Sequence, residues 1–184
     1  MAWNPTAGFV DLYGGREGLK AGIIRAVGQA EDRIHEDALR MLRGIRFATR
    51  LNFYLEDSLY QELQRQADRI GLVSVERIVE EMDKILLDSH APRGLNLLKE
   101  TDLLPSVIPE LSAVSDDVFD LTKRLLENSS HKINLRWAAL FRYAHEDYHE
   151  SGQLAKKRLT KLHWSKERIT TVGFLVGVER IKIK

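Results

Sequence analysis

The chain has no cysteine, only four prolines and no long apolar run. Without cysteine it forms no disulfide, no thiolate metal site and no cysteine nucleophile, and such a sequence fits a reducing cytoplasm. No apolar stretch approaches the roughly 20 residues of a membrane span, and the first residues lack a signal-peptide pattern. We therefore expect a cytoplasmic protein with no membrane partner.

A strong net charge is also absent, because 28 Lys and Arg face 27 Asp and Glu, which leaves +1. Bulk charge therefore makes no case for a nucleic-acid partner. Basic residues are nevertheless concentrated late in the chain, where residues 156–184 hold nine Lys or Arg and two acids. Such a run is either a solvated helix face or a patch for RNA phosphates. The candidates for RNA contacts are Lys156, Lys157, Arg158 and Lys161.

Apolar residues recur at steps of three and four over most of the chain, which predicts an all-α fold. At the start, two short apolar segments flank an Asn-Pro-Thr-Ala-Gly turn, which indicates a β-hairpin within residues 1–15. With 184 residues, 43% of them hydrophobic, the chain is long enough for a substantial core. The expected helices span residues 37–51, 57–71, 74–86, 92–99, 115–128, 134–148, 151–162 and 165–178.

Two prolines four residues apart interrupt the helical pattern in LLPSVIPEL, residues 103–111. Because proline ends or kinks a helix, we interpret this segment as a hinge between two helical halves. Trp137 and Phe141 are expected in a second core that belongs to the second half. The predicted domains are residues 1–24, 25–104 and 105–184.

The segment HEDALRMLRGIRFATRLNF, residues 35–53, places two carboxylates before a row of arginines. If it forms one helix, Asp37 lies beside Arg40 at i+3, and Glu36 lies over Arg40 at i+4. A solvated salt-bridge face is one interpretation. A site that recognises a planar, polar ligand is the other. The row continues with Arg43, Arg46 and Arg50.

The chemistry of the Asp37–Arg40 pair favours particular nucleobases. An ionised aspartate only accepts hydrogen bonds, whereas arginine only donates them, from a rigid fork. Cytosine and adenine present the complementary edge, with an amino donor beside a ring nitrogen that accepts. Uracil and guanine present the reverse, and would leave polar groups unpaired. Held side by side, the two residues are therefore expected to accept C and A.

Four segments of the chain carry a family resemblance when taken in order. They read FVDLYGGREGLKAGIIRAVG, EDALRMLRGIRFATRLNF, LVSVERIVEEMDKIL and LNLLKETDLLPSVIPEL. Together they resemble the class II tRNA nucleotidyltransferases and the related bacterial poly(A) polymerases, which add CCA, or A alone, to RNA 3′ ends. The resemblance implies that Glu36, Asp37 and Arg40 form a nucleotide-binding motif that reads the base. It also implies tRNA or another RNA 3′ end, with CTP and ATP, as partners.

The same resemblance implies further roles. Arg77, Glu81 and Lys84 match a family motif that braces the helix of the base-reading residues. Arg43 supports that helix from within it. The same spacing also fits an ordinary salt-bridge ladder. Asp11, Gly14 and Gly15 match a flexible corner between the catalytic head and the neck, in which Leu12 replaces the usual proline.

The family's triphosphate-binding loop and its D-x-D pair for Mg²⁺ are not found in the sequence. We therefore expect Mg²⁺ in the complete enzyme only, no metal bound by this chain, and no nucleotide addition by the chain alone. The hairpin then corresponds to a remnant of the head's sheet, and a head domain or a separate head polypeptide is an expected partner. The shared motif does not separate CCA-adding, A-adding and poly(A) activities.

The second half resembles a metal-dependent HD phosphohydrolase domain that has lost its ligands, which implies a degenerate, HD-like helical body. Leu121, the Phe141-Arg142 pair and Glu179 stand at ligand positions, and His149 alone remains. One histidine does not hold a metal ion. We expect this half to be structural and to contact tRNA.

Two other interpretations stay open. A stand-alone helical module could bind RNA phosphates through the arginine row and the basic run. Alternatively, HEDYH matches the zinc-protease pattern His145-Glu146-x-x-His149, which places two imidazoles on one face of a helix, with Glu167 as a conceivable third ligand.

Overall fold

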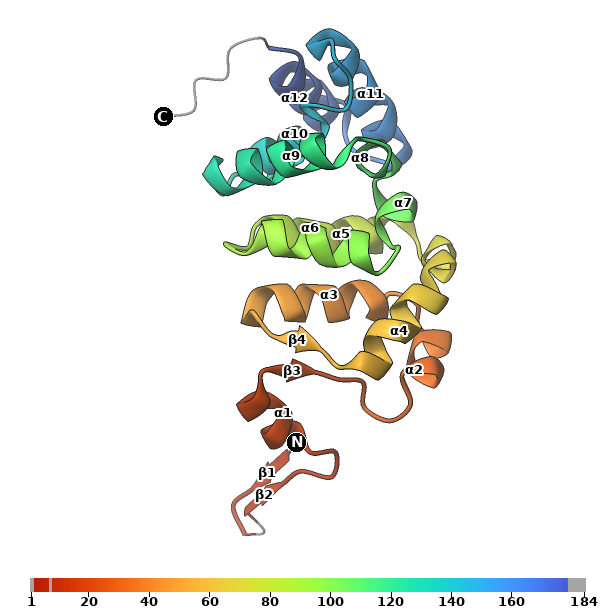
Figure 1. Ribbon diagram of the computed structural model, residues 1–184, viewed down its shortest axis with the longest axis vertical. Coiled ribbons are helices and arrows are strands. Elements are labelled where there is room, and N and C mark those ends of the chain that lie inside the picture. Colours follow the sequence, from red (N-terminus) through yellow and green to blue (C-terminus); the bar gives the residue numbers. More distant parts are fainter. Residues whose placement is uncertain (1, 7, 179–184) are drawn as a thin grey trace.

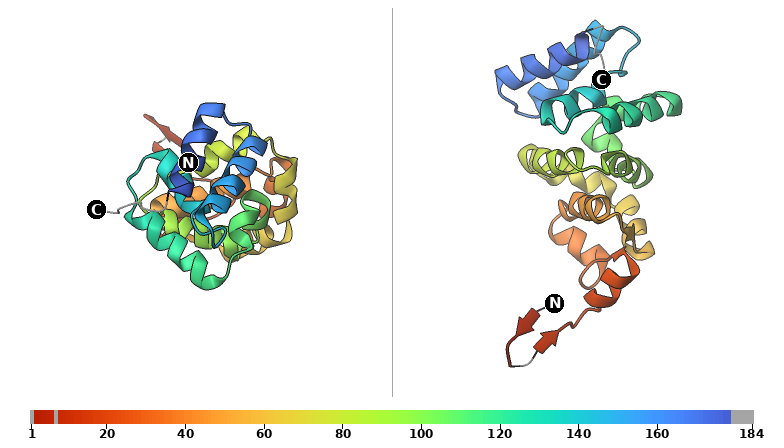
Figure 2. Two further views of the ribbon diagram at one scale, coloured as in Figure 1. Left: turned by 90° about the horizontal axis from the view of Figure 1, so that it is seen from above. Right: turned by 90° about the vertical axis from the view of Figure 1, so that its left-hand side faces the viewer.

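The computed structural model describes residues 2–6 and 8–178. Its α-helices are α1 Gly15–Ala21, α2 Ala30–Glu36, α3 Arg40–Leu51, α4 Asp57–Arg65, α5 Val75–Leu86, α6 Ala91–Glu100, α7 Leu104–Val107, α8 Pro109–Ser112, α9 Asp116–Asn128, α10 Ile133–Phe141, α11 Tyr148–Lys161 and α12 Lys166–Gly177. They form an elongated stack in which α3, then α5 and α6, then α9 and α10 follow one another as layers (Figures 1 and 2). The helices α11 and α12 cover the end opposite the N-terminal strands (Figure 1). The predicted all-α class is confirmed.

Two small sheets accompany the helices. Strands β1 (Ala2–Asn4) and β2 (Gly8–Val10) pair antiparallel, which confirms the predicted hairpin. Strands β3 (Ile23–Ile24) and β4 (Tyr54–Leu55) pair in parallel, and this contact was not predicted. Two residues per strand are too few to produce an alternating pattern, so the sequence carries no signal for it.

Several helix boundaries were predicted well, and polar side chains explain two of them. The hydroxyls of Ser115 and Ser165 accept the N–H groups of Val118 and Arg168, so these serines cap α9 and α12. The helix expected at 74–86 is α5, which follows Ser74, although no cap bond forms there. The helix expected at 92–99 is α6, and its proline lies in the first turn.

Four expected helices are wrong in extent. The helix expected at 57–71 divides into α4 and the 3₁₀ helix η1 (Ala67–Leu72), because the backbone leaves helical geometry at Gln66. The helix expected at 134–148 ends at Phe141, and the one expected at 151–162 begins at Tyr148. The reason is local: the Asp147 carboxylate accepts the N–H of Glu150 at 2.9 Å and so starts α11. The fourth, 37–51, is described with the site below.

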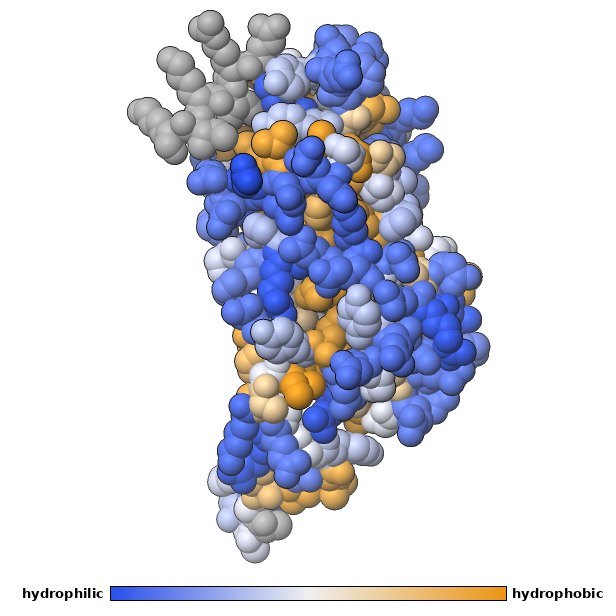
Figure 3. Space-filling model, in the orientation of Figure 1, coloured by the Kyte–Doolittle hydropathy of each residue, from blue (hydrophilic) through white to orange (hydrophobic). Residues whose placement is uncertain are grey.

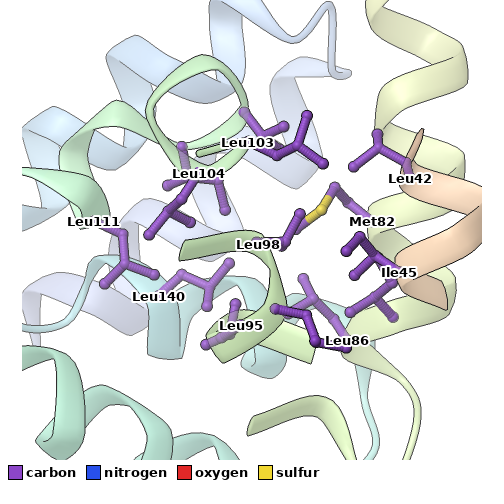
Figure 4. Packing of buried hydrophobic residues seen from close by; sticks show 14 of the residues in the cluster. Leu42, Ile45, Met82, Leu86, Leu95, Leu98, Leu103, Leu104, Leu111 and Leu140 are labelled. Carbon is purple, nitrogen blue, oxygen red and sulfur yellow. The ribbon is translucent and has the colours of Figure 1, made fainter. Parts of the chain in front are cut away.

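The expectation of two separate cores is wrong. One hydrophobic cluster contains buried side chains from α2 through α12, including those of the predicted hinge. Leu103 and Leu104 are less than 2% exposed, and Figure 4 shows Leu104 between Leu98 and Leu111, with Leu103 on the side of Leu42 and Met82. The domain boundary at residue 104 therefore stays a prediction, and the segment that carries it is buried.

Apolar side chains remain exposed at the N-terminal end. Trp3 is 70% exposed and Leu12 is 81% exposed, so the hairpin buries little of its surface. Figure 3 shows hydrophobic surface near the lower tip, where the N-terminal elements lie. Within residues 2–6 and 8–178, no helix is long and apolar enough to cross a bilayer.

Candidate functional site

The candidate site begins where the chain breaks between α2 and α3. Asp37 is extended there (φ −152°, ψ 102°), so the single helix expected from residue 37 onward is wrong. Its carboxylate Oδ1 accepts the N–H of Leu39 at 3.2 Å, and its carbonyl accepts the N–H of Arg40 at 3.0 Å. An aspartate that bonds the backbone two residues on favours a turn over a continuous helix, which explains the break.

The Asp37 carboxylate pairs with a residue of another helix. Arg77 of α5 donates from Nη2 to Asp37 Oδ2 at 2.9 Å, a partner that the spacing along one helix did not predict. Desolvation by burial raises the pKa of Asp37, but the hydrogen bonds from Arg77 and from the Leu39 N–H outweigh it, and the pKa lies below its usual 3.8. Asp37 is therefore an ionised acceptor near neutral pH.

Arg40 is held by Glu36, as the i+4 spacing predicts. Glu36 Oε2 lies 3.0 Å from Arg40 Nη1, and its other oxygen lies 2.8 Å from Arg33 Nη2. A guanidinium has five N–H donors, so the single contact with Glu36 leaves Arg40 with donors to spare. An acceptor and a donor thus lie three residues apart in the chain, each fixed by a different partner.

The Glu81 carboxylate of α5 is shared by three cations of α3 and α5. Its side chain is 4% exposed and lies 2.7 Å from Arg46 Nε, 3.0 Å from Lys84 Nζ and 3.9 Å from Arg43 Nε. The Arg46 contact is an ion pair by distance, although its N–H does not point at the oxygen. The predicted Glu81–Lys84 contact is confirmed, whereas Arg77 binds Asp37 instead of Glu81.

A pocket of about 300 Å³ lies next to Arg40 and Arg43. Its wall is mostly apolar and includes Phe47, which is 42% exposed. The guanidinium of Arg46 lies 4.1 Å from the centre of the Phe47 ring. The sequence analysis missed this pocket, because its walls come from α2, α3, α4 and the segment after β3.

The corner residues form a cap. The Asp11 carboxylate accepts the N–H of Arg16 at 2.7 Å and that of Gly15 at 2.9 Å, and these bonds lower its pKa. Gly14 has φ +64°, the left-handed conformation that glycine adopts without strain. Asp11 therefore stabilises the start of α1, and the flexibility of this corner stays a prediction.

The predicted basic patch is only partly available. Arg158 donates from Nε to both oxygens of Glu110, at 2.9 and 3.1 Å, so its charge is balanced within the fold. Lys156 lies over Gly173, where an added Cβ would meet its chain at 2.5 Å. Lys157 and Lys161 are exposed. Residues 179–184, including Glu179, lie outside the described residues.

The zinc-protease geometry is not formed. His145 lies in the loop before α11, where its ring nitrogen accepts the N–H of Asp147 at 3.0 Å, while His149 lies within α11. The two histidines therefore do not share a helix, which corrects that expectation. In the part of the chain that the structure describes, no three His, Asp or Glu side chains are grouped to hold a metal ion.

Comparisons with known proteins identify the family of the chain. Residues 52–114 match the family model described as the probable RNA and SrmB-binding site of polymerase A. The CCA-adding enzyme of Streptococcus thermophilus is 30% identical over 188 residues, which cover all of this chain and 44% of that enzyme. The chain belongs to the family of the CCA-adding enzymes and poly(A) polymerases.

Other members of this family cover parts of the chain. The CCA-adding enzyme of Geobacillus stearothermophilus is 46% identical over 103 residues, 56% of this chain and 26% of that enzyme. The crystal structure of the Bacillus stearothermophilus CCA-adding enzyme in complex with CTP superposes with a TM-score of 0.74 at 29% identity, over 95% of this chain and 42% of that one. The chain thus spans less than half the length of these CCA-adding enzymes.

Proposed function

We propose that this chain is the neck and body part of a nucleotidyltransferase that adds C and A, or A alone, to RNA 3′ ends. The observation that carries the proposal is the break between α2 and α3, where the Asp37 acceptor and the Arg40 donors lie three residues apart. Membership of the CCA-adding family supports it. The chain's own contribution is to select the base.

Selection follows from which hydrogen bonds each base can complete. The amino group of cytosine or adenine donates to the Asp37 carboxylate, and the neighbouring ring nitrogen accepts from Arg40. Uracil or guanine would place an acceptor against the carboxylate and a donor against the guanidinium. Because both groups lose water on binding, the wrong base leaves them unpaired.

Both side chains are positioned before a base arrives. Arg77 fixes the Asp37 carboxylate at 2.9 Å, and Glu36 fixes the Arg40 guanidinium at 3.0 Å. Neither partner exhausts the hydrogen-bonding capacity of the group it holds. Holding both groups in advance reduces the entropy that binding must overcome.

The test is to titrate the chain with CTP, ATP, UTP and GTP and to measure the four affinities by NMR. CTP and ATP are expected to bind roughly tenfold more tightly than UTP and GTP. Asp37→Asn replaces one acceptor by a donor, so it should shift the preference towards UTP and GTP. Asp32→Asn, on the exposed face of α2, is the matched control and should leave the order unchanged. Equal affinities for all four nucleotides would overturn the proposal.

Nucleotide addition is expected to need a catalytic head, either in the same polypeptide or on a separate one. The purified chain should not incorporate labelled CTP or ATP into a tRNA that lacks its 3′ CCA, with Mg²⁺ present. Incorporation by the chain alone would contradict this part of the proposal. With a head supplied, the order and number of nucleotides added would separate CCA-adding, A-adding and poly(A) activities.

A helical RNA-binding module is the second candidate, and the family model over residues 52–114 favours it because its description names an RNA-binding site. Such a module would bind tRNA with a steep salt dependence and without preference among the four nucleotides. The same titration therefore separates the two candidates.

A further inference from the structure

A polar hollow lies at the far end of α3 from the base-reading pair. It has a volume of about 520 Å³ and is lined by Arg46, Arg50, Lys84, Leu87 and Asp88. Arg50 follows Arg40 by ten residues, which is about 15 Å along a helix axis. The hollow is therefore separate from the position where a base would meet Arg40.

Two of its three cations are fixed in place. Glu81, which is 3% exposed, lies 2.7 Å from Arg46 Nε and 3.0 Å from Lys84 Nζ. The Arg46 guanidinium also rests on the ring of Phe47, at 4.1 Å from its centre. These contacts remove much of the side-chain freedom that an anion would otherwise have to restrict.

The third cation is available. Within residues 2–6 and 8–178, the exposed side chain of Arg50 forms no hydrogen bond or ion pair. The acid in the lining, Asp88, already accepts the N–H of His90 at 2.8 Å and faces its ring nitrogen at 3.2 Å. The three cations, Arg46, Arg50 and Lys84, outnumber the two acids, Glu81 and Asp88, so the hollow retains a positive charge.

Such a hollow suits a phosphate group, whose several oxygens accept hydrogen bonds from arginine and lysine together. We infer that Arg46, Arg50 and Lys84 bind a backbone phosphate of single-stranded RNA near its 3′ end. The inference rests on the proposed function for the identity of the RNA. The RNA-binding family model supports this source of phosphate, because it covers Lys84, Leu87 and Asp88.

The experiment measures binding of a fluorescein-labelled oligouridylate of about 12 nucleotides by anisotropy, in salt from about 50 to 200 mM. Arg50→Gln should weaken binding roughly three- to tenfold and make the slope of log K against log salt shallower by about 0.7. Arg50→Lys should retain most of the affinity, because the charge is kept. Arg50 is the residue to change, since it has no ion pair with any other described residue to lose.

Lys132→Gln is the matched control, because it removes one exposed positive charge just before α10, outside both the lining of the hollow and the basic run of residues 156–184. An Arg50→Gln effect no larger than that of the control would overturn the inference. An effect on CTP or tripolyphosphate affinity without one on the oligonucleotide would also overturn it, by assigning the hollow to a nucleotide's phosphates. If the chain showed no preference for CTP and ATP while Arg50→Gln still weakened oligonucleotide binding, the proposed function would be overturned and this inference would stand.

Discussion

Arg77 and Asp37 are forty residues apart in the chain, and their side chains meet at 2.9 Å. The contact ties the start of α5 to the break before α3. It means that the acceptor of the candidate base-reading pair is held by a helix that does not itself present a base-reading group. Arg77 is thus a positioning residue, and its effect is exerted through the ionisation and orientation of Asp37.

Arg77→Met is expected to raise the pKa of Asp37, because burial still disfavours the charged carboxylate while the main hydrogen bond to it is lost. In the unmodified chain the folded-state pKa is lowered, so the stability that Asp37 contributes is present above its usual 3.8 and is lost as the pH falls through the lowered value. In the variant that contribution shrinks. A carboxyl ¹³C NMR titration measures the shift, and exposed Arg124→Met should leave it unchanged. An unaltered Asp37 titration in Arg77→Met would refute the assignment.

Glu81→Gln is expected to lower the free energy of unfolding by about 2 kcal/mol, because Arg46, Arg43 and Lys84 lose the carboxylate that they share. The cost is below that of a fully buried pair, since two of the cations are about half exposed and regain water. Urea denaturation gives the value. Glu80→Gln, one residue earlier and exposed, should stay within about 0.5 kcal/mol. Similar results for the two variants would show that Glu81 does not organise the cations.

Gly94→Ala tests how closely α3, α5 and α6 approach one another. A Cβ at Gly94 would lie 2.6 Å from Ile85 Cγ2 and 2.9 Å from Thr49 Oγ1. We expect a loss of about 1–3 kcal/mol from this overpacking, despite the better helix propensity of alanine. Gly71→Ala is the control, because an added Cβ there has nothing within 4 Å. Thermal or urea unfolding that is equal for the two variants would mean that the helices can separate without cost.

Asp83→Leu tests a polar contact that joins α5 to the second half of the chain. Asp83 accepts from the indole N–H of Trp137 in α10 and lies 3.4 Å from Arg168 Nη2 of α12. Leucine would leave the buried indole donor unpaired, at a cost of about 1–3 kcal/mol. Asp83→Asn keeps an acceptor for Trp137 and loses only the charge, so its free energy of unfolding should lie between those of the unmodified chain and Asp83→Leu.

Urea denaturation followed by tryptophan fluorescence measures both Asp83 variants. Asp120→Leu is the control, because Asp120 is 58% exposed and its partner Lys123 lies on the same helix. If Asp83→Leu were as stable as Asp120→Leu, the contact between the two halves would not depend on this carboxylate.

The features that could be predicted from the sequence are mostly local. The helix starts at Ser115 and Ser165 and the Glu36–Arg40 pair depend on residues three or four apart, and the structure confirms them. Contacts between distant residues could not be predicted in this way. Arg77 was expected either to brace the helix of the base-reading residues or to join a ladder with Glu81, and its partner in the structure is Asp37. Arg158 was a candidate for RNA contacts and binds Glu110. In both cases a competing partner lies on an element whose position only the folded chain defines.

The break at Asp37 shows a second limit. The apolar stripe of α3 is strong and predicted a helix from residue 37, but the carboxylate bonds the Leu39 N–H and turns the chain. The spacing argument placed Asp37 and Arg40 on one helical face, whereas the structure places them on either side of a turn. Asp37 and Arg40 stay the residues proposed to read the base, and the single helix expected to carry them was wrong.

The short parallel pairing of β3 with β4 has a mechanical consequence. Gly22 and Ile24 accept the N–H groups of Tyr54 and Glu56 at 2.8 and 2.9 Å, directly after α3 ends. The segment that follows α1 is therefore hydrogen-bonded to the segment just after α3. The Arg77–Asp37 contact holds the other end of α3. Movement of the hairpin and α1 is therefore expected to reach the end of α3 through this pairing.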